Sequence, residues 1–179
     1  MKDETANNRL WHLHPLRVRY QETDQMGVVF HGNYVTWFEI GRTEYVRAFG
    51  MSYEAAEKQG LLLPVVDLDC AYLSPARYDD AVIVCTRLEQ YSPIRISFRS
   101  EIRLVNETDA VWTRNDKSLQ WFRGEEPPGK LLVRGGTRHV WVNRDWRPAR
   151  LDKAMPELYG LMESASHGIV PPDPGKGGS

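Results

Sequence analysis

The chain has 179 residues, of which 41% are hydrophobic and 26% are charged, and its formal net charge is −1. This size and composition are those of one globular domain with an apolar core, and the near-zero charge argues against a general attraction to nucleic acid or to an anionic membrane. No apolar run approaches the ~20 residues of a spanning helix, and no signal peptide is recognisable. Two cysteines, Cys70 and Cys85, form no CxxC motif. We therefore expect free thiols in a cytoplasmic protein, without membrane insertion.

The N-terminal third contains one strand, one loop and one long helix by its pattern. After a polar lead-in of about a dozen residues, residues 16–20 alternate as a strand with one buried face does. Residues 21–27 are polar and contain glycine, which is typical of a loop. A helix of about 17 residues follows from around Gly32-Asn33, and Gly50 is a suitable end for it. Its apolar or small stripe, at intervals of three and four, is Tyr34, Trp37, Phe38, Gly41, Tyr45, Ala48 and Phe49.

Four strands are expected in the remainder, at residues 61–71, 81–91, 94–104 and 131–143, with a short helix at about 156–162. Between the last two strands, residues 106–130 form either an extended hairpin or an inserted loop, which Trp112, Trp121 and Phe122 could anchor. Residues 164–179 are rich in Gly, Pro and Ser, so we expect a disordered tail after a single domain at 1–163. One long helix followed by antiparallel strands predicts an α+β fold, with a curved antiparallel sheet wrapped around one long central helix.

Reactive side chains are concentrated in the loop before the long helix and in that helix's first turns: Asp24, His31, Asn33, Tyr34 and Glu39. Each also has a structural interpretation. An aspartate in a loop commonly forms a turn or a cap, and His31 and Asn33 stand where a helix cap is expected. Tyr34 lies on the apolar stripe, and Glu39 lies off it in mid-helix.

A family resemblance favours the functional interpretation of these residues. The stretch YQETDQMGVVFHGNY at 20–34, with Glu39 and RTE at 42–44, resembles the signature of hotdog-fold acyl-CoA thioesterases of the 4-hydroxybenzoyl-CoA thioesterase family. The segments PVV at 64–66 and AYLSPARYDD at 71–80 continue the resemblance, as do Thr137 and His139 in the closing strand. The resemblance covers about residues 16–143. It implies the hotdog fold and the hydrolysis of an acyl-CoA or aroyl-CoA thioester.

The same resemblance implies roles for individual residues. Asp24 matches the family's catalytic carboxylate, which could act as nucleophile or as general base. Backbone N–H groups at the start of the long helix, near 33–36, would stabilise the tetrahedral oxyanion. His31 would orient a water or the carbonyl. The candidates for substrate binding are Asn33, Tyr34, Glu39 and Arg77, the last at a position that borders the CoA channel in the family.

Partners and alternatives follow from the same comparison. Members of the family form dimers or tetramers with active sites between subunits, so a homodimer or homotetramer is expected. A hotdog hydratase or dehydratase acting on a carrier-bound acyl chain, and a non-catalytic acyl-CoA binding protein, remain alternatives. The pair His12 and His14 has metal-ligand spacing, but no third ligand matches it, so we expect neither metal nor other cofactor.

Overall fold

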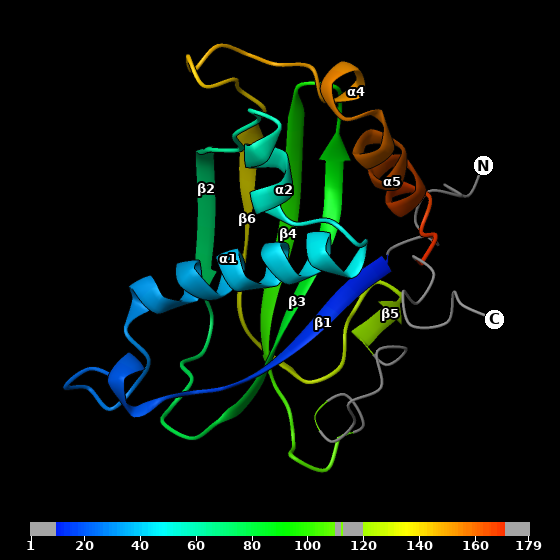
Figure 1. Ribbon diagram of the computed structural model, residues 1–179. Coiled ribbons are helices and arrows are strands. Elements are labelled where there is room, and N and C mark those ends of the chain that lie inside the picture. The colour runs from blue at the N-terminus through cyan, green and yellow to red at the C-terminus, as the bar shows by residue number, and fades with distance from the viewer. Residues whose placement is uncertain (1–9, 110–111, 113–119, 171–179) are drawn as a thin grey trace.

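The computed structural model describes residues 10–109, 112 and 120–170. Its centre is a six-stranded antiparallel sheet in the order β2-β6-β4-β3-β1-β5, which curves around the long helix α1 (Figure 1). The α+β prediction is therefore confirmed. The strands are β1 Leu10–Arg17, β2 Val65–Tyr72, β3 Ala81–Tyr91, β4 Arg95–Leu104, β5 Trp121–Arg123 and β6 Lys130–Val140. The helices are the 3-10 turn η2 Tyr20–Glu22, α1 His31–Ala48, α2 Tyr53–Lys58, α4 Leu151–Ala154 and α5 Pro156–Ser166.

The predicted stripe of α1 faces the sheet. Tyr34, Trp37, Phe38 and Tyr45 are at most 2% exposed. At Gly41 the helix approaches β3 so closely that an added Cβ would lie 2.3 Å from Thr86 Oγ1. The helix ends before Gly50, whose φ of 80° places it in the left-handed region that favours glycine. The long helix is thus held against the middle of the sheet over most of its length.

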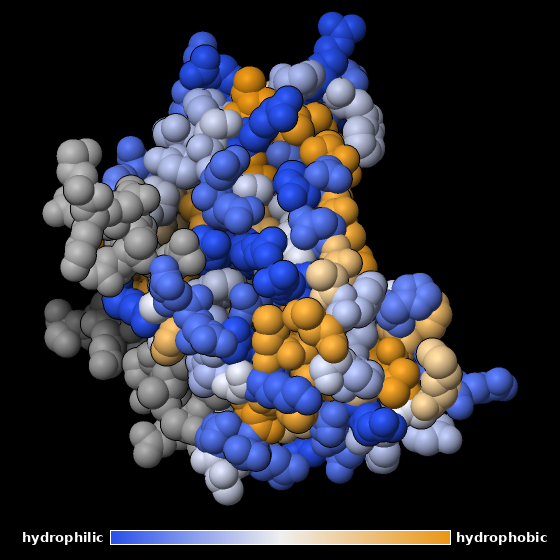
Figure 2. Space-filling view, turned by 180° about the vertical axis from the view of Figure 1, so that it is seen from behind, coloured by the Kyte–Doolittle hydropathy of each residue, from blue (hydrophilic) through white to orange (hydrophobic). Residues whose placement is uncertain are grey.

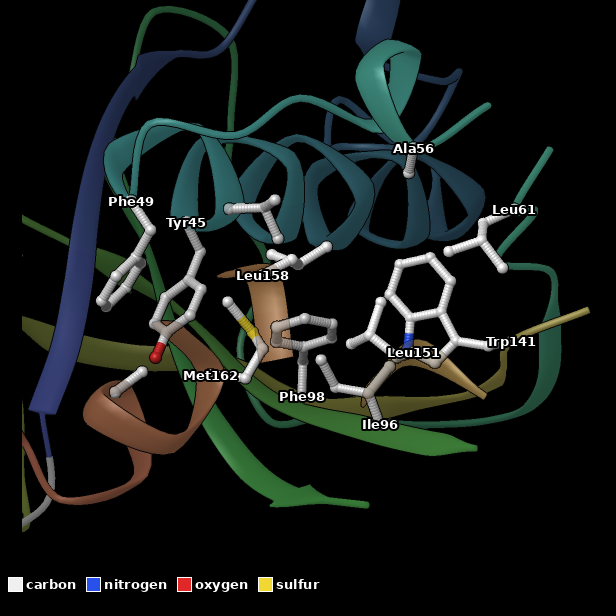
Figure 3. Packing of buried hydrophobic residues seen from close by; sticks show 12 residues of the cluster. Tyr45, Phe49, Ala56, Leu61, Ile96, Phe98, Trp141, Leu151, Leu158 and Met162 are labelled. Carbon is white, nitrogen blue, oxygen red and sulfur yellow. The ribbon is translucent and has the colours of Figure 1, made fainter. Parts of the chain in front are cut away.

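The second half of the core lies under the C-terminal helices. Figure 3 shows Leu158 and Met162 of α5 and Leu151 of α4 packed with Phe98 of β4 between α1 and the sheet. Neither α2 nor α4 was predicted, because each is too short for a clear periodicity. The boundary at residue 163 is too early, since α5 continues to Ser166 and the side chain of Ala165 is buried. Disorder was predicted for 164–179, and of this range residues 171–179 lie outside the described residues.

The first strand differs from its prediction. It runs from Leu10 to Arg17 rather than over 16–20, where the 3-10 turn η2 begins instead. Trp11 and Leu13 pack on the convex face of the sheet, and His12 is buried on the helix side. Because both faces of β1 are covered near its start, the alternation of apolar and polar residues that marks a half-buried strand is missing there.

The described part of 106–130 is an inserted segment rather than a simple hairpin. It leaves β4 and crosses to the far edge of the sheet, where β5 pairs with Leu10–His12 of β1. Trp112 and Phe122 cover an apolar cluster on the convex face, whereas Trp121 contacts Tyr45 and Phe49 on the helix side. Residues 110–111 and 113–119 lie outside the description. The convex face is otherwise largely hydrophilic, with separate apolar patches (Figure 2).

Candidate active site

Asp24 lies in the short loop between η2 and α1, and its backbone and side chain both shape that loop. Its N–H donates to Val28 O at 2.9 Å, and its own carbonyl accepts from the N–H of Gly27, which has a φ of 70°. Its carboxylate atom Oδ1 accepts from Met26 N at 2.8 Å. The other oxygen, Oδ2, has no hydrogen-bond donor in the described part of the chain. Asp24 is therefore a turn residue that keeps one carboxylate oxygen available, in a half-buried position.

The N-terminus of α1 follows directly after this loop. The N-cap position is occupied by Phe30, which makes no side-chain cap, so the predicted capping by His31 and Asn33 is wrong. The N–H of Asn33 donates to Phe30 O at 2.9 Å. Within the described residues, the N–H groups of His31 and Gly32 have no acceptor. Of the N–H groups expected to face an oxyanion, that of Asn33 is therefore occupied, whereas those of His31 and Gly32 are free helix N-terminal donors in the described part of the chain.

Glu22 was not singled out by the sequence, yet it is the most constrained acidic residue of the region. It is 4% exposed, and its carboxylate accepts from Arg19 N at 2.8 Å, Arg19 Nη2 at 3.0 Å and Trp37 Nε1 at 3.0 Å. Burial alone would raise the pKa of Glu22, but the hydrogen bonds from Arg19 and Trp37 outweigh it and lower that pKa. Its backbone carbonyl also binds the side-chain amide of Asn33, at 2.8 Å.

The remaining side chains near the helix start have unequal roles. Tyr34 is buried and accepts a hydrogen bond from Ala76 N at 2.9 Å, and burial raises its pKa. His31 is exposed, and its ring packs on Phe30 with the centroids 4.3 Å apart. No hydrogen bond joins His31 to Asp24 among the described residues. Tyr72, at the end of β2, donates from its hydroxyl to the carbonyl of His31 at 3.1 Å.

The last two candidates, Arg77 and Glu39, differ in whether they reach the loop that carries Asp24. Arg77 reaches the Asp24 loop, where its Nη1 donates to Gly27 O at 3.3 Å. Glu39 lies two turns into α1, is largely exposed, and stands 4.0 Å from Arg42. It lines a separate cavity of about 130 Å³ with Arg42, Tyr53 and other residues, but not with Asp24. The structure therefore brings Arg77, but not Glu39, to the loop that carries Asp24.

Other chemistry finds little support in the described residues. They hold no group of three or more His, Cys, Asp or Glu side chains that could bind a metal ion. Cys70 and Cys85 are free, as predicted. The helices in the described ranges are all too short or too polar to cross a membrane. Two arginines of β4 are paired with carboxylates, since Arg103 is buried against Glu101 at 2.7 Å and Arg99 lies 3.8 Å from Asp69.

A long helix enclosed by a curved antiparallel sheet, with a polar loop at the helix N-terminus, is the hotdog architecture. The sequence model of the Thioesterase superfamily matches residues 26–112, a range that begins just after Asp24. The chain is 31% identical over 151 residues to a putative acyl-CoA thioesterase, YneP, of Bacillus subtilis, which covers 84% of this chain and 94% of that protein. The chain belongs to the Thioesterase superfamily.

Solved structures agree with this assignment. A DHNA-CoA thioesterase from Staphylococcus aureus superposes with a TM-score of 0.71 at 32% identity, over 86% of this chain and 89% of that one. A 4-hydroxybenzoyl CoA thioesterase superposes with a TM-score of 0.64 over 84% of this chain and 97% of that one. The identity of the second pair is 15%, so this likeness concerns the fold alone. The hotdog prediction is confirmed.

Proposed function

We propose that the protein hydrolyses an acyl-CoA or aroyl-CoA thioester to free CoA and a carboxylic acid, with Asp24 as the catalytic carboxylate. The reaction class is that of its relatives in the superfamily, among them the acyl-CoA thioester hydrolase YbgC of Escherichia coli, 31% identical over 102 residues. One observation supports the assignment of residues above the others. The free carboxylate oxygen of Asp24 and the free N–H groups of His31 and Gly32 belong to a single loop-to-helix junction.

This junction provides the two groups that thioester hydrolysis needs. A carboxylate can attack the thioester carbonyl and form an anhydride, or it can take a proton from an attacking water. In either case the carbonyl oxygen gains negative charge, which unpaired helix N–H groups stabilise. The leaving thiol has an ordinary pKa near ~8.5, so it departs as a thiolate without a strong general acid. The two roles of Asp24 differ in whether solvent oxygen can enter the Asp24 carboxylate in a single turnover, as it does when water attacks the Asp24 side of an anhydride.

Substrate contacts are proposed at both sides of this junction. The exposed ring of His31 would orient a water or the thioester carbonyl, and Arg77 would attract the CoA phosphates. Asn33 and Tyr34 would border the acyl group while they hold the loop and the helix start in place. Glu39 lies further along α1. It would contact a substrate only if the acyl group extends along α1 to the cavity that Glu39 lines with Arg42.

We further propose that the enzyme is a cytoplasmic homodimer or homotetramer assembled through β2. This strand lies at the edge of the sheet, and its side chains are exposed over nearly its whole length. Apolar side chains on it include Val65, Val66 and Leu68, exposed by 43%, 57% and 36%. An open apolar edge pairs readily with a second copy. Because Tyr72 of β2 contacts His31, a copy paired there would lie beside the proposed active site.

The deciding experiment measures thiol release from a panel of acyl-CoA and aroyl-CoA esters by the wild type and by Asp24→Asn. The substitution keeps the shape of the side chain and removes its charge. We expect kcat/KM to fall at least ~100-fold, with an unchanged circular dichroism spectrum. Asp152→Asn, which removes a carboxylate paired with Arg150 on α4, is the matched control and should leave activity unchanged.

Two results would redirect the assignment. If the wild type binds CoA esters without hydrolysing any, the hydratase, dehydratase or binding alternatives replace it. If the wild type is active and Asp24→Asn retains that activity, the enzyme class stands, and the catalytic group lies elsewhere.

A further inference from the structure

Glu22 occupies an unusual position for a carboxylate. It is buried, it lies two residues before Asp24, and its partners come from both sides of the catalytic loop. We infer that Glu22 is a positioning residue, which fixes the Asp24 carboxylate relative to the free N–H groups at the start of α1. The inference rests on the proposed function, because it assigns a role within that same site.

The side chain of Glu22 joins the loop to the helix. On one side it accepts from the backbone N–H and the guanidinium of Arg19, which precedes the 3-10 turn. On the other side it accepts from the indole N–H of Trp37, whose ring is fully buried in the second turn of α1. A fully buried indole has few alternative rotamers, so the carboxylate is tied to a rigid point of the helix.

The backbone of Glu22 closes the loop at its other end. Its carbonyl accepts from the N–H of Phe30 at 2.9 Å and from Nδ2 of Asn33 at 2.8 Å. Phe30 is the residue immediately before the free N–H of His31, and Asn33 lies in the first helical turn. Glu22 therefore holds, through one residue, the segment that carries Asp24 and the segment that carries the proposed oxyanion donors.

The chemistry of these contacts requires a carboxylate. All three groups that meet the side chain are donors, and an ionised carboxylate is the side chain that only accepts. A glutamine would turn its NH₂ group toward Arg19 or Trp37, leaving a buried donor opposite another donor. The lowered pKa keeps Glu22 ionised at neutral pH despite its burial. A residue needed only to fill space here would be apolar, because burying a charge is costly unless every oxygen is paired.

The test compares Glu22→Gln and Trp37→Phe with the wild type, using the acyl-CoA ester that the wild type hydrolyses best. Trp37→Phe removes the N–H donor and keeps an aromatic ring. We expect kcat to fall ~10- to 100-fold in both variants while KM stays within ~3-fold, because misplacing a catalytic group by about 1 Å costs up to ~100-fold in rate. Glu54→Gln, which makes the same substitution in the exposed pair with Lys58, is the control and should leave kcat unchanged.

A second readout is independent of turnover. In ¹⁵N-labelled protein, the amide of Met26 reports on Asp24, because it donates to Asp24 Oδ1. We expect Glu22→Gln to shift both the Met26 amide and the Trp37 indole N–H signals, and Glu54→Gln to shift neither. A residue that only supported folding would lower the stability and leave the Met26 amide of the folded protein unchanged.

The outcomes separate this inference from the proposed function. If the wild type is active and kcat of Glu22→Gln stays within ~2-fold, or if KM rises alone, the positioning role is overturned and the thioesterase assignment survives. If the wild type hydrolyses no ester, the proposed function fails, and an unmoved Met26 amide in Glu22→Gln overturns the positioning role as well. If Glu22→Gln does not fold, kcat and the Met26 amide of Trp37→Phe decide by the same criteria.

Discussion

Two histidines, His12 and His139, are buried on the helix side of the sheet, and burial lowers the pKa of each to about 4. The charge of His14 lowers the pKa of His12 further, and the charge of Arg42 lowers the pKa of His139 further. The ring of His139 is held by Thr137 Oγ1 at 2.8 Å. Both imidazoles are therefore neutral in the folded protein at pH 6, whereas in the unfolded chain they begin to take up protons below pH 6.5.

These histidines predict acid lability in a defined window. Since the folded pKa lies below the unfolded one, stability is full above pH 6.5 and is lost as the pH falls toward 4, by up to about 3 kcal/mol for each histidine. His139→Gln should flatten this dependence. The measurement is the urea midpoint at pH 7.5, 6, 5 and 4.5, with His31→Gln, at an exposed position, as control. A wild-type midpoint that stays constant from pH 7 to 5 would contradict the prediction.

The residue scale also shows how far the sequence could define the site. The motif around Asp24 and the segment that carries Arg77 were recognisable, and the structure brings Arg77 to the Asp24 loop. Glu22 was not recognisable as a buried residue, because its partners are a backbone N–H and an indole 15 residues away. A polar loop residue gives no periodic signal when its burial depends on tertiary contacts.

At the scale of elements, the helix stripe and the long strands were predictable because their periodicity extends over ten residues or more. β3 matches its prediction at both ends, and β4 begins one residue later than expected. The failures are short or doubly covered elements. The six-residue helix α2 has a clear N-cap, in which Ser52 Oγ accepts from Ala55 N, but it is too short for an apolar stripe. Capping signals alone rarely distinguish such a turn from a loop.

The contact between α1 and β3 predicts opposite effects of one substitution at two helical glycines. Gly41→Ala would place a methyl group 2.3 Å from Thr86 Oγ1 and 2.5 Å from Val84 Cγ1, which are buried and β-branched side chains. We expect it to lower the free energy of unfolding by about 2 kcal/mol.

Gly160 in α5 is the matched control, because nothing lies within 4 Å of an added Cβ there. Gly160→Ala should raise the free energy of unfolding by about 0.5–1 kcal/mol through helix propensity. Urea denaturation of the two variants provides the comparison. Equal effects of the same sign would show that α1 does not approach β3 as closely as described.

At the scale of the whole molecule, the two edges of the sheet differ. The edge formed by β2 has eight residues and exposed apolar side chains, and it carries ion pairs from Asp67 and Asp69 to Arg138 of β6 at 2.7 and 2.8 Å. The opposite edge ends in the three-residue strand β5. The unequal edges support the proposal that copies of the chain would associate through β2.

This asymmetry predicts the effect of a charge on the β2 edge. Val66→Lys places an ammonium group on the proposed interface, where two symmetric copies would repel each other. We expect its molar mass in light scattering to fall to that of a monomer, 20.6 kDa, at micromolar concentrations. Glu157→Lys, at an exposed position of α5, serves as the control. An unchanged mass for Val66→Lys would place the interface elsewhere.

The short strand β5 affects how many copies of the chain could add to the edges of the sheet. A sheet that is open on both sides can recruit further copies without limit and become a fibre, as edge-to-edge aggregates do. Here the described part of the inserted segment covers one side of the sheet over Leu10–His12 of β1, with a strand of three residues. Recruitment through β2 would then end with two chains, because pairing two copies uses the eight-residue edge of each. If copies associate through β2, the insertion would limit further growth at the opposite side of the sheet, in addition to covering part of the convex face.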